Sequence, residues 1–268
     1  MKFDLHTHHQ RCGHARGSLR DYLEAALAAD LDVLGCSDHS PFFGEEADHY
    51  KPWVAMARSE FHSYLSECVA LREEYRGRID LRIGVESDFF PEHVETYRRI
   101  YEGLDLDYVI GSVHVVGELD IFHPDRWIDA TDEFLEGEKE RYCDLVAESA
   151  RSGLYDILGH IDALRGDCPR LASIETPAVD RMIEAIVEAD VVVEVNTSGV
   201  TKRCGGWYPD DALLIRLRDN GIRLTFGSDA HDPHRVGDQF ERVRIRLREL
   251  GYREWYVFER RQPRAIPL

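Results

Sequence analysis

The segment D-Y-V-I-G-S-V-H, at residues 107–114, joins a short apolar run to a histidine. A run rich in valine and isoleucine is typical of a strand in a parallel sheet, because such strands are buried on both faces. Similar runs recur along the chain and alternate with longer amphipathic segments, which is the pattern of successive β/α units. The predicted strands cover roughly residues 2–6, 32–37, 80–86, 107–113, 155–159, 190–196 and 222–228.

Seven predicted helices lie between and after these strands, at roughly residues 18–30, 54–76, 91–103, 131–152, 175–189, 209–220 and 238–250. Thr131 is expected to cap the fourth helix, because a threonine hydroxyl can accept a hydrogen bond from the first turn. Gly153, Gly221 and Gly251 stand where helices are expected to end. The segment R-V-R-I-R-L-R at 242–248 alternates like a strand, but its apolar residues also share one helical face, and we favour a helix.

No internal repeat and no long polar linker separates the seven units, so we expect a single α/β domain over residues 1–268. Such units close into a barrel, for which about eight strands are standard. Seven units therefore predict a distorted, TIM-like (β/α)7 barrel. An additional strand in W-Y-V-F at 255–258 is the alternative, and we favour the seven-stranded form.

The composition indicates a soluble globular protein, since 43% of the 268 residues are hydrophobic and 31% are charged. The formal net charge is −18, from 33 basic and 51 acidic residues, which argues against binding to nucleic acid or to an anionic membrane. The N-terminus, M-K-F-D-L-H-T-H, has an acid and two histidines where a secretion signal would have its apolar stretch, so we expect no such signal. No apolar run approaches the length of a membrane span. The six cysteines have no C-x-x-C spacing, so we expect a cytoplasmic protein with free thiols.

Nearly every predicted strand ends at a residue that could bind a metal ion. The C-terminal ends of parallel strands form one face of a barrel, where such side chains would converge. Alternate residues of a strand project to the same side, so His6 and His8 can face one ion. The candidate ligands are His6, His8, His14, His39, Glu86, His114, His160, Asp229 and His231.

Nine ligands exceed the set of about three that one catalytic zinc takes, so two or three ions are implied. Imidazole and carboxylate ligands without thiolate suit zinc, iron or manganese. Cys12 and Cys36 lie near ligands in the sequence and are expected to pack beside them. The remaining histidines are assigned to the surface or to packing, although the first and last of them could touch the site: His9, His49, His62, His93, His123 and His234.

An ordered set of motifs, from Asp4 to about Tyr252, resembles the polymerase-and-histidinol-phosphatase (PHP) superfamily, and within it the histidinol-phosphatase group. The motifs are D-L-H-T-H, C-G-H-A, S-D-H-S-P, G-V-E-S-D-F, D-Y-V-I-G-S-V-H, G-H-I-D, V-N-T-S-G and F-G-S-D-A-H. The resemblance implies a distorted seven-stranded barrel that holds three divalent metal ions.

The family's ligand pattern can be carried over residue by residue. It implies a first ion held by His6, His8, Glu86 and Asp229. Glu86 would bridge to a second ion, which also takes His114 and His160. His14, His39 and His231 would hold the third ion. The resemblance also implies a phosphatase acting on a small phosphorylated metabolite, with histidinol phosphate as the expected substrate and a metal-bridging hydroxide as nucleophile. Glu86, Asp229 and His231 are the expected catalytic residues.

The expected phosphate-binding residues are Arg165, Lys202 and Arg203, because arginine can hold a phosphate through two hydrogen bonds. Histidinol-phosphatases of this group usually carry a basic residue where this chain has Thr201, and a basic stretch after G-H-x-D is here reduced to Arg165. These departures weaken the assignment of the substrate more than the assignment of a phosphatase.

Several alternatives stay open at this stage. Asp88 and Tyr208 adjoin site motifs and could meet the amine or ring of an amino-alcohol phosphate. A related phosphoesterase could act on another phosphorylated metabolite or on nucleotide or oligonucleotide ends. A metal-dependent amidohydrolase is disfavoured because no lysine stands at a strand end, and a non-catalytic metal scaffold would need only structural coordination. The sequence leaves open which metals bind, the general acid and the oligomeric state.

Overall fold

The computed structural model describes residues 1–45, 48, 54–117 and 119–268. At its centre is a parallel sheet of seven strands, which follow one another in the sheet as they do in the chain. The strands are β1 (Phe3–Asp4), β2 (Val33–Cys36), β3 (Asp80–Asp88), β4 (Tyr108–Ser112), β7 (Ile157–Leu158), β8 (Val192–Asn196) and β9 (Leu224–Gly227). Each of the seven predicted strands is present, although β1 and β7 are shorter than expected.

The sheet closes because its first and last strands lie side by side. The backbone N–H of Leu5 donates to the carbonyl of Phe226 at 3.2 Å, and Thr7 forms a parallel bridge with Ala230. Neighbouring strands of the sheet all run parallel. The predicted distorted seven-stranded barrel is therefore confirmed, and the C-terminal ends of its strands meet at one end.

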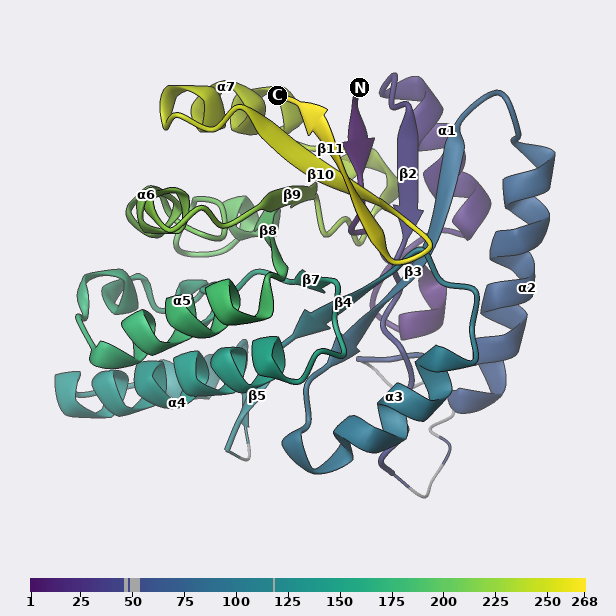
Figure 1. Cartoon of the computed structure of the whole chain (residues 1–268). Helices are drawn as coiled ribbons and strands as arrows, with labels where there is room; N and C mark the ends of the chain where they lie inside the picture. Colours follow the sequence, from purple (N-terminus) through teal and green to yellow (C-terminus); the bar gives the residue numbers. More distant parts are fainter. Residues whose placement is uncertain (46–47, 49–53, 118) are drawn as a thin grey trace.

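Helices surround the outside of the sheet (Figure 1). They are α1 (Leu19–Ala28), α2 (Arg58–Glu74), α3 (Val94–Glu102), α4 (Asp132–Arg151), α5 (Pro177–Ala189), α6 (Asp211–Asp219) and α7 (Phe240–Glu249). Short 3-10 helices are η1 (Gln10–Cys12), η2 (Pro91–His93), η3 (Pro124–Trp127), η4 (Ala163–Arg165), η5 (Pro169–Ser173), η6 (Ser198–Thr201) and η7 (Pro233–Arg235). Thr131 caps α4 by accepting from the N–H of Phe134 at 3.2 Å, and the arginine-rich segment 242–248 is helical, as predicted.

Two antiparallel hairpins lie outside the barrel sheet. One pairs β5 (Val115–Val116) with β6 (Leu119–Asp120), and the other pairs β10 (Glu254–Glu259) with β11 (Gln262–Pro267). The W-Y-V-F segment at 255–258 is thus a strand, but its partner is β11 and it does not join the barrel. Figure 1 shows this C-terminal hairpin in yellow.

The C-terminal hairpin covers the end of the barrel at which the strands begin. Trp255 packs against Phe3, the first residue of β1, with ring centroids 4.8 Å apart. Arg261 donates from Nε to Asp156 at 2.7 Å, and Asp156 directly precedes β7. The hairpin is therefore fixed to this end by aromatic packing and by an ion pair.

The state of the cysteines agrees with the expectation of free thiols. All six cysteines have free thiols, and Cys12 and Cys36 are buried. Among the described residues, no helix has both the length and the apolar character needed to cross a membrane.

Candidate metal centre

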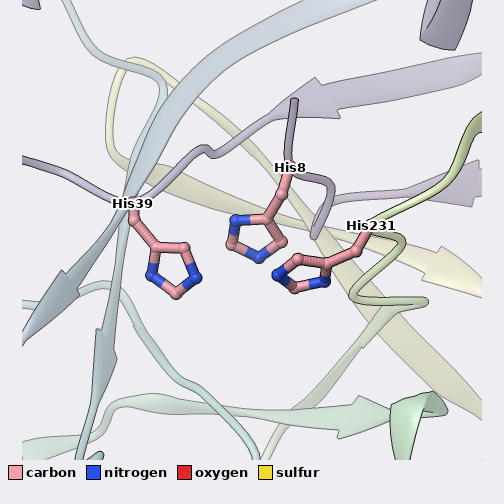
Figure 2. Close-up of side chains that lie close together, drawn as sticks. All are labelled: His8, His39 and His231. Carbon is pink, nitrogen blue, oxygen red and sulfur yellow. The ribbon is translucent and has the colours of Figure 1, made fainter. Parts of the chain in front are cut away.

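The nine predicted ligands come from the C-terminal ends of the barrel strands and from the loops that follow them. Glu86 lies within β3, and the other ligands follow a strand or the short helix η1. Figure 2 shows His8, His39 and His231, which come from three separate segments and whose rings lie together. The ring centroid of His8 lies 4.2 Å from that of His39 and 4.2 Å from that of His231. The structure thus brings distant parts of the chain to one point.

Glu86 stands at the centre of this cluster and is almost fully buried. Its Oε2 lies 2.8 Å from Nδ1 of His39, and its Oε1 lies 3.0 Å from Nε2 of His160. In all, its carboxylate oxygens lie within 3.5 Å of five imidazole nitrogens, from His6, His8, His39, His114 and His160. This carboxylate can therefore bridge two groups of histidines.

The remaining candidate ligands extend the cluster toward the surface. Asp229 Oδ1 lies 3.0 Å from Nε2 of His8, and the Nε2 atoms of His14 and His231 lie 2.9 Å apart. Asp229 and His160 have φ angles of 53° and 27°, in the left-handed region that non-glycine residues rarely adopt. Such strain costs on the order of 1–3 kcal/mol per residue and is concentrated at functional sites in proteins.

The buried polar atoms of the cluster fit divalent metal ions. Oε2 of Glu86 lies 2.8, 3.4 and 3.5 Å from Nδ1 of His39, Nε2 of His6 and Nε2 of His8, but none of these four buried atoms makes a contact with hydrogen-bond geometry. A buried polar group that lacks a partner costs about 1–3 kcal/mol. Among the described residues, four groups have ligand atoms within 4.8 Å of one another. Three consist of candidate ligands: His8, His39 and His231; His6, His8 and Glu86; and His39, Glu86 and His114. The fourth joins His8 to Cys12 and Asp38. Nitrogen and oxygen donors in such groups are the ligands of zinc and similar ions.

Three carboxylates contact Nδ1 of ligand imidazoles and so fix the orientation of these rings. Glu194 lies 2.6 Å from Nδ1 of His6, Asp88 lies 2.8 Å from Nδ1 of His114, and Asp38 lies 3.4 Å from Nδ1 of His8. An Nδ1–H that donates to a carboxylate leaves Nε2 free to bind a metal, which is the usual arrangement around metal-binding histidines.

The sequence interpretation missed two of these carboxylates and placed the third differently. Glu194 and Asp38 were not singled out, although a glutamate inside the apolar run V-V-V-E-V-N was the available signal for Glu194. Asp88 was a candidate for contact with the substrate amine or ring. In the structure its carboxylate is bound to His114, so its first role is to hold that imidazole.

The carboxylates control the charge of the inner histidines. Burial alone would lower the pKa of His8, but its bonds to Asp229 and Asp38 raise the pKa to about 9. Burial is likewise outweighed at His114, where Asp88 and Glu86 raise the pKa to about 10. In the metal-free protein these imidazoles are therefore protonated at neutral pH.

The two histidines at the rim have the opposite shift. Desolvation, together with the imidazoles of His39 and His8, lowers the pKa of His14 to about 4. Desolvation and His8 also lower the pKa of His231 well below its usual value. A neutral imidazole is the form that binds a metal ion, so these two rings do not have to lose a proton first.

A cavity of about 760 Å³ opens over the cluster, and only one of the three expected phosphate-binding residues lines it. Lys202 does, with its Nζ 4.4 Å from the centre of the Phe122 ring. Arg165 lines a separate cavity and donates from Nε to Asp162 at 2.7 Å. Arg203 is exposed and is not part of the lining. Arg165 and Arg203 are therefore not part of the lining of this cavity, and their contact with a substrate stays a prediction.

Two arginines that the sequence interpretation missed do line the cavity. Arg16 follows His14 by two residues, and Arg235 follows His231 by four. Their closeness in sequence to candidate ligands was the only available signal, and it is a weak one in a chain with many arginines.

The other histidines lie mostly away from the cluster. His62, His123 and His234 are exposed, and His93 is half-buried in η2. His9 is buried and its Nδ1 is bound to Asp38, so it contacts the site through the carboxylate that holds His8. His49 lies outside the described residues.

Comparison with known proteins agrees with this geometry. The PHP domain family model matches residues 4–198. The chain belongs to the PHP domain family. This PHP-family chain is 32% identical over 252 residues to a Deinococcus radiodurans protein named "probable histidinol-phosphatase", with 93% of this chain and 94% of the relative covered. It is 28% identical over 262 residues to the histidinol-phosphatase of Bacillus subtilis, with 90% of this chain and 97% of the relative covered.

The fold of this PHP-family chain also matches a solved structure. The histidinol phosphate phosphatase of Lactococcus lactis, solved with zinc, L-histidinol and phosphate, aligns with a TM-score of 0.80 at 18% identity. The alignment covers 98% of each chain. At this identity the likeness concerns the fold, and it agrees with the seven-stranded barrel described above.

Proposed function

We propose that this PHP-family chain is a metal-dependent phosphatase that hydrolyses histidinol phosphate to histidinol and phosphate, as in histidine biosynthesis. The observation that carries the proposal is the buried Glu86 carboxylate within 3.5 Å of five imidazole nitrogens. The names of relatives that cover at least 90% of the chain supply the substrate. The proposed location is the cytoplasm, and no nucleic acid partner is expected.

The proposed metal content is three divalent ions, of zinc, iron or manganese. His6, His8, Glu86 and Asp229 would hold the first ion. Glu86 would bridge to the second, with His114 and His160, while His14, His39 and His231 would hold the third. When bound, such ions lower the pKa of a bound water and neutralise charge on a phosphoryl group.

The side chains of the protein contribute in two further ways. Glu194, Asp88 and Asp38 hold the imidazoles in fixed orientations through Nδ1. Asp229 and His231 line the cavity, and lowered pKa values keep both side chains unprotonated, so either can accept a proton from a water molecule and pass it to the leaving alkoxide. Glu86, Asp229 and His231 are therefore the proposed catalytic residues.

A second candidate substrate class is another phosphorylated metabolite. The observation that favours it is the position of Arg165 and Arg203 outside the cavity over the cluster, together with Thr201 at a position that is usually basic in this group. The same metal-dependent chemistry would serve either substrate.

Turnover of a panel of substrates tests the proposal. Histidinol phosphate, other phosphorylated metabolites, a simple aryl phosphate, single-stranded DNA and an amide are each offered to the metal-loaded protein. Its metal content is measured by elemental analysis. We expect histidinol phosphate to be preferred and chelation to abolish its hydrolysis. If the aryl phosphate is hydrolysed equally fast while another metabolite is strongly preferred, the second substrate class is correct. Cleavage of DNA or the amide alone contradicts the phosphatase.

A further inference from the structure

Three basic side chains line the cavity over the cluster, and they lie at two different ends of it. Lys202 lies over Phe122, whose ring centroid is 6.2 Å from that of His114. Arg16 and Arg235 belong to the segments that carry His14 and His231, and Arg235 ends the short helix η7 that follows His231. The backbone N–H of Arg16 donates to the carbonyl of His231 at 2.9 Å.

His39 separates the two ends. Its ring centroid lies 5.6 Å from that of His114 and 5.9 Å from that of His231. A phosphoryl group bound to the His14 and His231 end therefore lies on the side of the two arginines. Lys202 faces the opposite end, where the rest of a substrate would lie.

Arg235 is held in place by the barrel. Its Nε and an Nη atom donate to Asp238 at 3.3 and 2.8 Å, and the backbone carbonyl of Asp238 accepts from Thr197 Oγ1 at 3.0 Å. Thr197 directly follows β8. The guanidinium is thus positioned at the edge of the cavity before any ligand arrives, which lowers the entropic cost of binding.

Arg16 has a different environment. Among the described parts of the chain, no carboxylate forms an ion pair with its guanidinium, and its side chain is exposed at the mouth of the cavity. An arginine of this kind is available to an anion, and the planar guanidinium matches two oxygens of a phosphate group.

We propose that Arg16 and Arg235 bind the phosphoryl oxygens of the substrate at the His14 and His231 end of the cavity. This inference rests on the proposed phosphatase function and names the substrate class more closely. Two guanidinium groups at one end favour a dianionic terminal phosphate, so the site selects monoesters over diesters, whose phosphate carries a single charge. The two arginines take the role that the sequence assigned to Arg165 and Arg203.

The test uses the metal-loaded protein with Arg16→Gln, Arg235→Gln and, as a matched control, Arg264→Gln. Arg264 is exposed on β11, outside the lining of this cavity. The measurements are kcat and KM for 4-nitrophenyl phosphate, turnover of its bis-ester, and the inhibition constant of inorganic phosphate. For each arginine of the cavity we expect KM and the phosphate inhibition constant to rise about tenfold or more, as for a lost charge-assisted hydrogen bond. Bis-ester turnover should change less, and metal content should be unchanged.

Two further variants separate binding from structure. Arg235→Lys keeps the charge and should restore part of the affinity for phosphate. Asp238→Asn breaks the same ion pair but keeps the guanidinium, so it should have a smaller effect than Arg235→Gln. If Asp238→Asn reproduces the whole loss, or if the glutamine variants bind phosphate as tightly as the control, the inference is wrong.

The failure of this inference is distinguishable from the failure of the proposed function. If the unsubstituted protein hydrolyses no phosphate monoester, the proposed function fails. Calorimetric binding of inorganic phosphate to the metal-loaded protein still tests the two arginines in that case, and equal affinity in all variants would overturn their assignment.

Discussion

The two ends of the barrel differ in how their buried side chains are paired, although the same strands run between them. At the end where the strands begin, Trp255 packs on Phe3, and the charge of Arg261 is paired with Asp156. At the end where the strands finish, polar atoms of His8 and Glu86 are buried without hydrogen-bond partners. The first end is held by apolar packing and an ion pair and leaves the indole N–H of Trp255 without a partner, whereas the second end gathers several such atoms around Glu86.

The difference shows at which end of the barrel the binding of metal ions would stabilise the protein. A buried polar group without a hydrogen-bond partner destabilises a protein by about 1–3 kcal/mol, and a bound metal ion would remove this cost for the atoms gathered around Glu86. We call the end with Trp255 and Arg261 the paired end, and the end with His8 and Glu86 the unpaired end. Side-chain packing at the paired end stabilises the fold without a bound ligand. Substitutions at the paired end should therefore lower the free energy of unfolding and leave metal affinity unchanged. Substitutions at the unpaired end should lower metal affinity.

The largest effect is expected at the centre of the unpaired end. Glu86→Gln removes the carboxylate charge that faces five imidazoles, so both groups of histidines lose their shared ligand. Loss of an outer partner of a metal site already costs about 10- to 100-fold, and we expect hydrolysis to fall by more than that, with loss of bound metal. Elemental analysis and kcat measurements check this. Near-full activity with full metal content would show that Glu86 is not a ligand.

The corresponding change at the paired end is Trp255→Ala. Trp255 is fully buried, and replacing such an aromatic residue by alanine typically costs about 3–5 kcal/mol of unfolding free energy. Urea unfolding of the metal-free protein measures the loss. At temperatures where the variant is folded, its metal content and kcat should match those of the unsubstituted protein. A variant that keeps its stability but loses metal would contradict the division between the two ends.

A smaller effect on metal binding is expected for the carboxylates that bind Nδ1 of the histidines. Glu194→Gln weakens the bond that orients His6 and should lower metal affinity about 10- to 100-fold without abolishing binding. Competition with a chelator of known affinity measures this change. The matched control is Glu138→Gln, because Glu138 is also a buried glutamate but is paired with Arg126 and Arg141 on the outside of the barrel. The control should lose stability and keep its metal affinity.

The pH dependence should have opposite signs for metal binding and for the stability of the metal-free protein. The raised pKa values of His8, about 9, and His114, about 10, exceed the value of about 6.5 for unfolded histidine. Their stabilising contribution is therefore complete below about pH 6.5 and is lost as pH rises toward 9 and 10. Metal binding must displace the same protons, so affinity should rise over that range.

Zinc titrations of the metal-free protein in weak and strong buffers measure this linkage. At pH 7 uptake should release protons from the inner histidines but not from His14, whose pKa is lowered to about 4. Uptake without proton release, or affinity that is constant between pH 7 and 9, would contradict the charge assignment.

The sequence predicted those features that have a local signature. The seven strands follow from the alternation of apolar and amphipathic segments, and the candidate ligands follow from their places at strand ends. Glu194 and Asp38 could not be placed, because their partners His6 and His8 are distant in the chain and no local pattern marks a long-range hydrogen bond. The strand at 255–258 was recognisable, but its pairing with β11 depends on packing against Phe3 at the other end of the chain.

The smallest effect is expected for a residue that the sequence and the structure assign differently. Arg203 was expected to bind phosphate because it follows V-N-T-S-G, but its side chain is exposed and lies outside the cavity lining. An exposed charge that does not touch the substrate contributes little, because solvent and salt screen it. We expect Arg203→Gln to change kcat/KM for histidinol phosphate by less than about twofold, compared with about tenfold for a lost charge-assisted hydrogen bond. Lys202→Gln, the neighbouring residue that does line the cavity, provides the comparison in the same assay. A tenfold loss in Arg203→Gln would restore the interpretation from sequence and would mean that the loop carrying Thr201 turns toward the substrate when it binds.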